Sequence, residues 1–270
     1  MSEEKKEEKV EEKKEEKKEE KKDEKKDDKE GEDDEVKLHW PPLESDPAIF
    51  NEYFHSIGIK PEVYFKEILA LVDYKEFLSI QGPLLGIILN YSRDENNKEE
   101  TFPKAEKVPF FIKQTKELDN ACGLIAALHC FGNAKNGEFE FVKDSILDEF
   151  FKSVKNRTPQ EVAKLLDENE KFKQAHKCFS GKGQTNLKKE VKNDFVGHFI
   201  CFMNMNGKLV EFDGIKEAPS IIKENIDDQS FIDETFNEIL KRINNKSIYE
   251  QVNVMFVADD KTGLIDLLLD

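Results

Sequence analysis

A cysteine stands where an apolar helix is expected to begin, and that position gives it access to nucleophilic chemistry. Cys122 is followed by Leu124, Ile125, Leu128 and Phe131, which recur at the spacing of one helix face. The N-terminus of a helix carries a partial positive charge that favours a thiolate over a thiol. Because the thiolate is the nucleophilic form, Cys122 is a candidate nucleophile; a buried structural thiol is the alternative.

A histidine and an aspartate are brought together by a predicted β-hairpin. Two apolar, β-prone runs are joined by Asn206-Gly207, the strongest short hairpin signal. With these residues in the turn, Met205 pairs with Lys208, and the same register makes His198 and Asp213 diagonal neighbours on one face. The sequence therefore predicts a histidine whose ring is oriented by a carboxylate.

These three residues together suit covalent thiol catalysis. An imidazole accepts or stabilises the thiol proton, and a carboxylate fixes the tautomer and orientation of the ring. Taken singly, His198 is an ordinary strand histidine and Asp213 a turn former before Gly214. Their shared face, combined with Cys122, predicts a nucleophile with its base.

The segments that carry these residues resemble the ubiquitin carboxyl-terminal hydrolase family, a group of papain-like cysteine peptidases. The resemblance rests on Gln114-Thr115, Asn120-Ala121-Cys122-Gly123, His198-Phe199-Ile200 and Glu211-Phe212-Asp213-Gly214, with the family's fifteen-residue step from histidine to aspartate. Residues 40–47 (WPPLESDP) resemble the family's opening segment, and Gly183-Gln184-Thr185 resembles a motif of its active-site crossover loop. The similarity spans about residues 38–260.

The resemblance implies a role for four residues. Cys122 is the implied nucleophile, His198 the general base and acid, and Asp213 the group that orients the histidine. Gln114 is implied as an oxyanion donor beside the Cys122 backbone N–H. The family usually has a step of six residues from glutamine to cysteine, whereas the step here is eight, so two additional residues lie between Lys116 and Asp119.

The remaining cysteines and histidines lack the spacing of a metal site. His176-Lys177-Cys178 contains no paired ligand set, and His198 and Cys201 point to opposite faces of a strand. His129 and Cys130 lie deep in the helix that follows Cys122, where core packing explains them. We therefore predict neither a metal nor another cofactor.

The first 36 residues are predicted to be a disordered charged tail, and residues 37–270 one catalytic domain. Residues 1–35 contain 19 acidic and 12 basic side chains, and after Met1 their only aliphatic or aromatic residue is Val10. Such a segment has no apolar surface to offset the entropy cost of ordering. Its four-residue charge period also places like charges at i,i+4, which disfavours a helix.

Composition narrows the partners and the compartment. Without the tail's net charge of −7, the whole-chain charge of −16 leaves −9 on residues 36–270, which suits a basic partner such as the arginine-rich tail of ubiquitin or serves solubility alone. The mixed charge of the tail disfavours nucleic acid. Without a signal segment or a long apolar run, we expect no membrane association and a location in the cytosol or nucleus. Four cysteines fit that reducing setting, and we expect a monomer that binds ubiquitin or a ubiquitin-like protein.

The chain pattern predicts an α+β fold with a central antiparallel sheet between helical layers, and the resemblance implies that this fold is of papain-like type. Helices are expected over 46–71 with a break at Gly58, after Cys122, over 139–154, over 158–166 and over 230–242, and Asp119 or Asn120 is expected to cap the cysteine helix. Strands are expected over 83–91, over 108–114, in the hairpin and over 249–258; residues 169–194 read as a long irregular crossover loop.

Three functions fit these features. The first is a deubiquitinating thiol hydrolase that releases small or flexible adducts from the terminal glycine of ubiquitin through a thioester, since only a slender tail threads under a crossover loop. The second is an acyltransferase built on the same Cys-His-Asp set. The third is a ubiquitin-binding module with an impaired site, a reading that the two-residue insertion keeps open.

Overall fold

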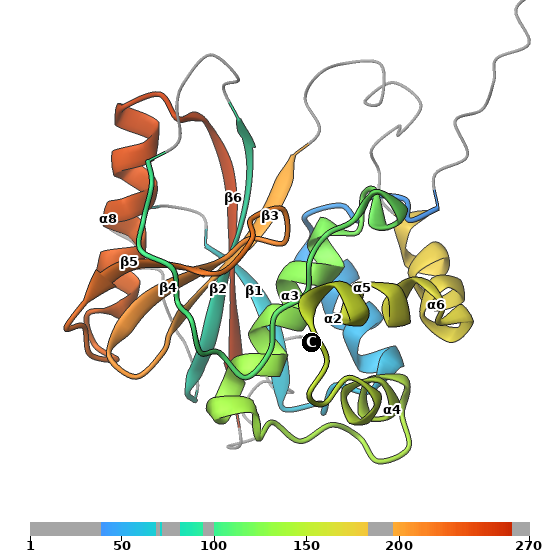
Figure 1. The fold of residues 1–270 in the computed structure, drawn as a ribbon. Coiled ribbons are helices and arrows are strands. Elements are labelled where there is room, and N and C mark those ends of the chain that lie inside the picture. Colours follow the sequence, from blue (N-terminus) through green and yellow to red (C-terminus); the bar gives the residue numbers. More distant parts are fainter. Residues whose placement is uncertain (1–38, 69–70, 72–81, 94–99, 183–196, 261–270) are drawn as a thin grey trace, which may run out of the picture. The chain divides into compact units, whose positions relative to one another are not determined.

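Six strands form one antiparallel sheet at the centre of the molecule (Figure 1). The structure, a computed structural model, describes residues 39–68, 71, 82–93, 100–182 and 197–260. The strands lie in the order β1-β6-β2-β3-β4-β5. Their bounds are β1 Val63–Ile68, β2 Leu84–Arg93, β3 His198–Asn204, β4 Lys208–Phe212, β5 Ser220–Glu224 and β6 Ile248–Asp259.

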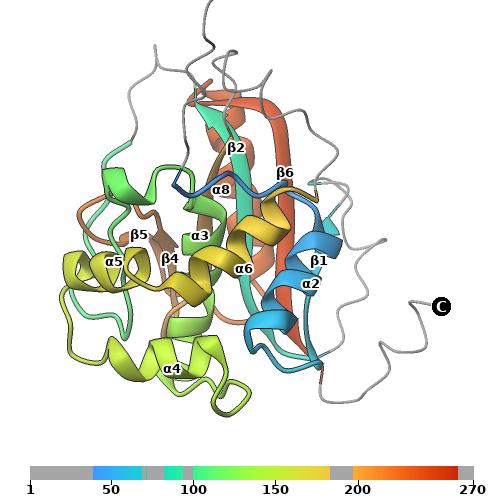
Figure 2. The same cartoon turned by 90° about the vertical axis from the view of Figure 1, so that its right-hand side faces the viewer.

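Helices cover both faces of this sheet (Figures 1 and 2). One face carries α2 Pro47–Ile57, α3 Cys122–Asn133, α4 Ile146–Ser153, α5 Pro159–Asp167, α6 Glu170–Ser180 and the 3₁₀ turns η2 Lys116–Leu118 and η3 Ala134–Gly137. The other face carries α8 Phe231–Asn244. Each side has its own apolar core, so the predicted sandwich of an antiparallel sheet between helical layers is confirmed.

The helix that begins with the cysteine is the innermost helix of the larger layer. Every residue of α3 is buried, and the helix packs on β3, the strand that begins with His198. Gly132 illustrates how closely its surroundings fit, because a Cβ at that position would lie 2.5 Å from the ring of Phe110. Such packing fixes where the start of α3 lies relative to the hairpin.

Several predicted elements are confirmed. β2 is an interior strand between β6 and β3, and β6 covers the predicted terminal strand. The helix predicted over 158–166 is α5, and a capping box begins it, since Thr158 accepts from the Glu161 N–H and the Glu161 side chain accepts from the Thr158 N–H. The apolar face of α8 is also present, with Phe231, Phe236 and Ile239 buried.

The helix expected to resume after Gly58 is a strand instead. Gly58 ends α2 with a φ of 123°, and residues 63–68 then form β1, paired antiparallel with β6. Val63, Tyr64 and Phe65 are β-branched or aromatic, and the neighbouring strand supplies their backbone partners. The helical spacing of the apolar residues was therefore the wrong signal in this stretch.

Residues 108–114 are extended but do not belong to the sheet, so the predicted strand there is wrong. Side chains of α3 take the place of a neighbouring strand: the Asn133 amide exchanges two hydrogen bonds with the backbone of Phe110, at 3.1 and 2.8 Å. The His129 Nε2 accepts from the Ile112 N–H at 3.1 Å. This segment is thereby tied to the helix whose start it approaches.

Two further boundaries differ from the predictions. The helix expected over 139–154 begins only at Ile146, because Asp144 adopts a φ of 61° and Ser145 caps the helix at its N-terminus. The irregular connection expected over 169–194 contains α6, which Asn169 caps and which buries Phe172 and His176 one turn apart. Its charged residues face solvent, and their number made the sequence of this helix resemble that of a loop.

Some predictions fall on residues outside the described part. They are the charged tail, the Gly183-Gln184-Thr185 motif and the remainder of the predicted crossover loop. Within the described ranges, no helix has both the length and the apolar character needed to span a bilayer.

Candidate active site

The β3–β4 hairpin adopts the predicted register. Cys201 pairs with Phe212 and Asn204 with Leu209, which is the register derived from an Asn206-Gly207 turn. Both turn residues have positive φ, 54° and 80°, as a two-residue type I′ turn requires. Turn chemistry and strand pairing thus place His198 and Asp213 at the same end of the hairpin.

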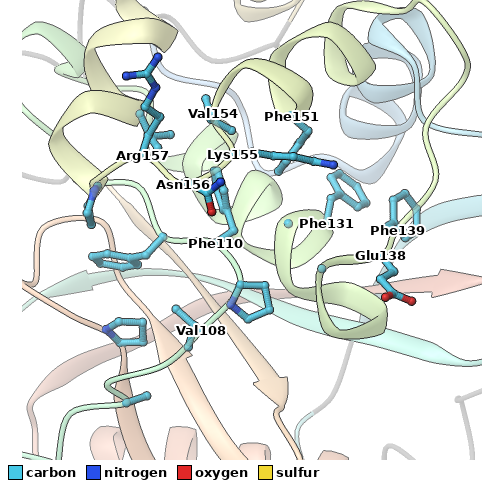
Figure 3. A pocket seen from close by; sticks show the side chains of 18 of the residues that line it. Val108, Phe110, Phe131, Glu138, Phe139, Phe151, Val154, Lys155, Asn156 and Arg157 are labelled. Atoms are coloured by element: carbon cyan, nitrogen blue, oxygen red, sulfur yellow. The ribbon is translucent and has the colours of Figure 1, made fainter.

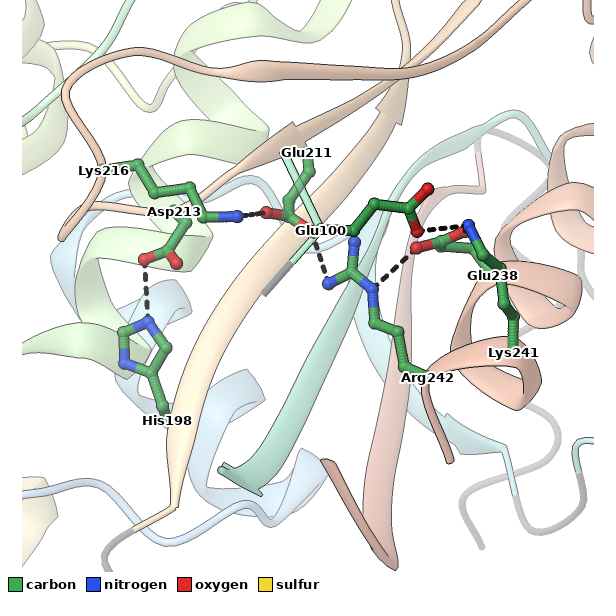
Figure 4. A network of polar contacts seen from close by, with 8 residues as sticks. All are labelled: Glu100, His198, Glu211, Asp213, Lys216, Glu238, Lys241 and Arg242. Carbon is green, nitrogen blue, oxygen red and sulfur yellow. Dashed lines mark hydrogen bonds and ion pairs between the residues drawn. The ribbon is translucent and has the colours of Figure 1, made fainter. Parts of the chain in front are cut away.

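The two side chains meet through a short hydrogen bond (Figure 4). The His198 Nε2 lies 2.8 Å from the Asp213 Oδ1, and the same oxygen accepts from the Ile215 N–H at 3.1 Å. The Asp213 side chain is fully buried, so the hydrogen bonds take the place of its lost hydration. Because Nε2 faces the carboxylate, the other ring nitrogen, Nδ1, is left for the thiol.

Cys122 is the first residue of α3 and lies beside the imidazole. Cys122 is near enough to contribute to the raised pKa of His198, and its exposed fraction is 7%. The Cys122 backbone N–H belongs to the first turn of the helix, where N–H groups have no partner within the helix. A thiol, a base and a free backbone donor thus converge at one point.

The charges of the site favour a protonated histidine. Burial by itself lowers the pKa of His198, but the hydrogen bonds to Asp213 and Cys122 outweigh it and raise the pKa to about 9. An imidazolium at neutral pH stabilises a thiolate beside it and is ready to protonate a leaving group. The geometry and the pKa of His198 therefore both suit a histidine that acts as a proton donor beside Cys122.

Gln114 lies next to this group with its amide engaged. Its Nε2 donates to the Asp119 carbonyl at 2.7 Å and to the Leu118 carbonyl at 3.3 Å. Its backbone N–H donates to the Gly214 carbonyl at 2.8 Å, next to Asp213. The structure thus places Gln114 between the two halves of the site, with its donors directed at the turn that contains the insertion.

Asp119 makes contacts that the sequence did not predict. Neither Asp119 nor Asn120 caps α3: the N-cap residue is Ala121, without a side-chain hydrogen bond, so the capping prediction is wrong. The Asp119 carboxylate instead accepts from the backbone N–H groups of His39, at 3.1 Å, and Trp40, at 2.9 Å. Its place in the insertion was the one signal that could have drawn attention to it.

A buried network of charges anchors the hairpin on its other side (Figure 4). Glu211 precedes Asp213 by two residues and pairs with Lys216 and with Arg242 of α8, each at 2.6 Å. The Arg242 Nε also donates to Glu238 at 2.8 Å. Burial opposes the charge of Arg242, but Glu211 and Glu238 outweigh it and keep its pKa above the usual value.

A cavity of about 730 Å³ lies apart from these residues (Figure 3). Phe110, Phe139 and Phe151 contribute to its wall, and Arg157 lies at it. None of Gln114, Cys122, His198 and Asp213 is among the described residues that line it. The candidate chemistry therefore does not belong to this cavity.

The arrangement defines a class of protein. A cysteine at the start of a buried helix, facing a histidine and an aspartate on a hairpin of an antiparallel sheet, is the arrangement of papain-like cysteine peptidases. The family description "Ubiquitin carboxyl-terminal hydrolase, family 1" matches residues 40–244. The chain belongs to this family.

Curated relatives align with about two thirds of this chain. Ubiquitin carboxyl-terminal hydrolase 3 of Arabidopsis thaliana is 34% identical over 190 residues, which are 67% of this chain and 77% of that protein. A ubiquitin carboxyl-terminal hydrolase of Drosophila melanogaster is 28% identical over 190 residues, 67% of this chain and 81% of the relative. Isozyme L1 of Rattus norvegicus is 28% identical over 186 residues, 66% and 80%.

A solved structure has the same fold. The catalytic domain of Trichinella spiralis UCH37, bound to ubiquitin vinyl methyl ester, superposes with a TM-score of 0.62. The match covers 82% of this chain and 96% of that one at 22% identity. At this level of identity the comparison speaks for the fold.

Proposed function

We propose that this chain is a deubiquitinating thiol hydrolase, which cleaves small or flexible adducts from the C-terminal glycine of ubiquitin. The observation that carries the proposal is Cys122 at the start of α3 beside a His198 that is hydrogen-bonded to Asp213, in a chain of the ubiquitin carboxyl-terminal hydrolase family. The names of the relatives and the ubiquitin adduct of the Trichinella spiralis protein support ubiquitin as the partner.

The first half of the reaction forms a thioester. The Cys122 thiolate attacks the carbonyl carbon of the terminal glycine, and the carbonyl oxygen becomes an oxyanion. The Cys122 N–H and the Gln114 side-chain amide are the proposed donors to that oxygen. As the bond to the leaving group breaks, the His198 imidazolium gives its proton to the departing amine or alcohol.

The second half releases ubiquitin. Neutral His198 takes a proton from a water molecule, whose oxygen attacks the thioester carbonyl. The carbon–sulfur bond then breaks, which frees the C-terminal carboxylic acid of ubiquitin and returns Cys122 to the thiolate form beside an imidazolium; the acid then loses its proton to solvent. Asp213 keeps Nδ1 directed at the sulfur throughout, since its carboxylate holds Nε2.

Intact-mass analysis tests the proposal. The folded chain is incubated with ubiquitin that carries a C-terminal thiol-reactive group, and Cys122→Ala and Cys178→Ala are run beside it. Cys178 is exposed and lies on α6, so it controls for modification of any accessible thiol. We expect one ubiquitin-sized adduct on the wild type and on Cys178→Ala, and none on Cys122→Ala.

Two results would contradict this assignment. An adduct on Cys122→Ala would exclude Cys122 as the nucleophile, and no adduct on any folded variant would exclude ubiquitin as the substrate. Turnover of a ubiquitin C-terminal fluorescent amide then separates a hydrolase from a binding module. Transfer of ubiquitin to an added amine in preference to water would instead support the acyltransferase reading.

A further inference from the structure

We propose that Asp119, a residue of the segment that contains the insertion, is a positioning residue for oxyanion stabilisation. It joins the turn that holds the Gln114 amide to the backbone of residues 39–40. This inference rests on the proposed function and deepens it, because it assigns a task to the residues by which this chain departs from the family spacing.

The Asp119 carboxylate is committed to three backbone N–H groups. Oδ2 accepts from His39, and Oδ1 accepts from Trp40 at 2.9 Å and from Asn120 at 2.8 Å. The first two donors lie about eighty residues away in the sequence, so these bonds are tertiary contacts. The carboxylate therefore fixes the turn before α3 against a distant segment.

The same residue holds the amide of Gln114 through its main chain. The bond from Gln114 Nε2 to the Asp119 carbonyl is 2.7 Å long, whereas the bond to the Leu118 carbonyl is 3.3 Å. The Gln114 Oε1 is buried and accepts no hydrogen bond from any residue that the structure describes. The Asp119 carbonyl is thus the stronger anchor of the amide, and the hydrogen on the longer bond is the one available to an oxyanion.

The segment to which Asp119 binds is itself firmly held. Trp40 is fully buried, and its indole N–H donates to the Asp167 carboxylate of α5 at 3.1 Å. The His176 Nε2 of α6 lies 2.7 Å from the Pro41 carbonyl. Asp119 therefore links the Gln114 amide to a segment that α5 and α6 hold in place.

A double-mutant cycle measures this coupling. Asp119→Ala, Gln114→Ala and the double variant are compared with the wild type in kcat and KM for a ubiquitin C-terminal fluorescent amide, with active sites counted by the thiol-reactive ubiquitin. We expect Asp119→Ala to lower kcat about 10- to 100-fold with little change in KM, and to have less than about a threefold effect when Gln114 is already alanine.

Two variants separate positioning from charge and from folding. Glu117→Ala removes an exposed carboxylate from the same turn and is expected to keep the wild-type kcat. Asp119→Asn retains one carbonyl acceptor and is expected to recover much of the rate lost in Asp119→Ala. An equal loss of kcat from Asp119→Ala with and without Gln114 would overturn the inference, as would an unchanged kcat.

A second readout is independent of any substrate. In the ¹⁵N-labelled protein, the side-chain amide resonances of Gln114 are expected to move in Asp119→Ala and to stay in place in Glu117→Ala. Unmoved Gln114 resonances would overturn the inference even if activity fell. Absence of turnover by the wild type would instead count against the proposed function, and the resonances would still decide whether Asp119 positions Gln114.

Discussion

The two halves of the site are held by different means. On the hairpin side, Asp213 and Glu211 are buried carboxylates whose partners are charged or can become charged, namely His198, Lys216 and Arg242. On the α3 side, the hydrogen bonds join the side chains of Asp119 and Gln114 to backbone groups. Ion pairs between buried charges therefore hold the hairpin half in position, whereas hydrogen bonds to the backbone hold the α3 half.

This difference explains where the chain tolerates variation. Two additional residues are accommodated between Gln114 and Cys122, because carbonyl and carboxylate oxygens of the enlarged turn accept the hydrogen bonds of its surroundings. In the strands between His198 and Asp213, one additional residue would turn every later side chain of β4 to the other face of the sheet, and two would move Asp213 two positions along the strand from His198. The fifteen-residue spacing is thus a geometric requirement, and the spacing before Cys122 is adjustable.

Removing the buried charge of Asp213 should have the largest effect. Asp213→Asn is expected to lower kcat/KM by about 10²- to 10⁴-fold, because the imidazole loses the group that holds its tautomer. The pKa of His198, about 9 in the wild type, should fall when the bond from Asp213 no longer raises it. The alkaline limb of the profile of kcat/KM against pH should therefore move to lower pH; an unmoved limb would contradict the assignment of His198.

Breaking the network behind the hairpin should affect stability next. Arg242→Ala leaves Glu211 and Glu238 buried without their shared partner, and we expect the free energy of unfolding to fall by about 3 kcal/mol. Lys208→Ala, which breaks the exposed pair with Glu224, serves as the control and should cost less than about 1 kcal/mol. Denaturant titration measures both, and similar costs would show that burial does not distinguish these ion pairs.

On the α3 side, we expect the buried His176 to make the stability of the fold sensitive to acid. Burial lowers the pKa of His176 to about 4, below its ordinary value of 6.5, so the folded chain rejects a proton that the unfolded chain binds. The contribution of His176 to the free energy of unfolding is fully present above pH 6.5 and is lost as the pH falls toward 4. At pH 5 this loss amounts to about 2 kcal/mol.

Thermal unfolding at pH 7.5 and pH 5 checks this expectation. His176→Gln keeps an amide donor for the Pro41 carbonyl but does not titrate, so its Tm should fall less between the two pH values than that of the wild type. His39→Gln changes an exposed histidine and should retain the wild-type difference. An identical pH dependence in all three proteins would remove His176 from the explanation.

The smallest expected effect concerns the hairpin turn. Gly207→Ala places a side chain on a residue with a φ of 80°, and we expect a loss of about 1 kcal/mol in the free energy of unfolding. Gly181→Ala is the matched control, since Gly181 has a φ of −86° and a Cβ there would make only an ordinary contact, 3.9 Å from the Lys177 carbonyl oxygen. Equal effects would show that backbone conformation at the turn is not what favours glycine there.

Local rules predicted the hairpin half of the site better than the α3 half. The Asn206-Gly207 turn and the alternation of side chains suffice to place His198 beside Asp213, since both signals act between neighbouring residues. The helix beginning at Cys122 was also predicted from its own apolar spacing. The hydrogen-bond partners of Asp119 were not predicted. A carboxylate just before a helix indicates an N-cap, and the local sequence does not show that a distant segment binds this one instead.

The same limit accounts for the errors in the fold. Residues 108–114 have the composition of a strand, yet the backbone of Phe110 and Ile112 bonds to side chains of α3, a contact that no local pattern encodes. β1 shows the converse case, since pairing with β6 overrides the helical spacing of its apolar residues. Where distant segments supply the backbone hydrogen bonds, these contacts override the local propensity of the sequence.

The tight turn at Asn206-Gly207 also bears on the order in which the site assembles. A short hairpin closes within microseconds, whereas α3 must be brought to it across some seventy residues of chain, which is slower. The base and its carboxylate should therefore be paired in the refolding chain before the nucleophile arrives. Rapid-mixing experiments should then find that reactivity toward thiol-reactive ubiquitin appears only in the last folding phase, after the hairpin has formed.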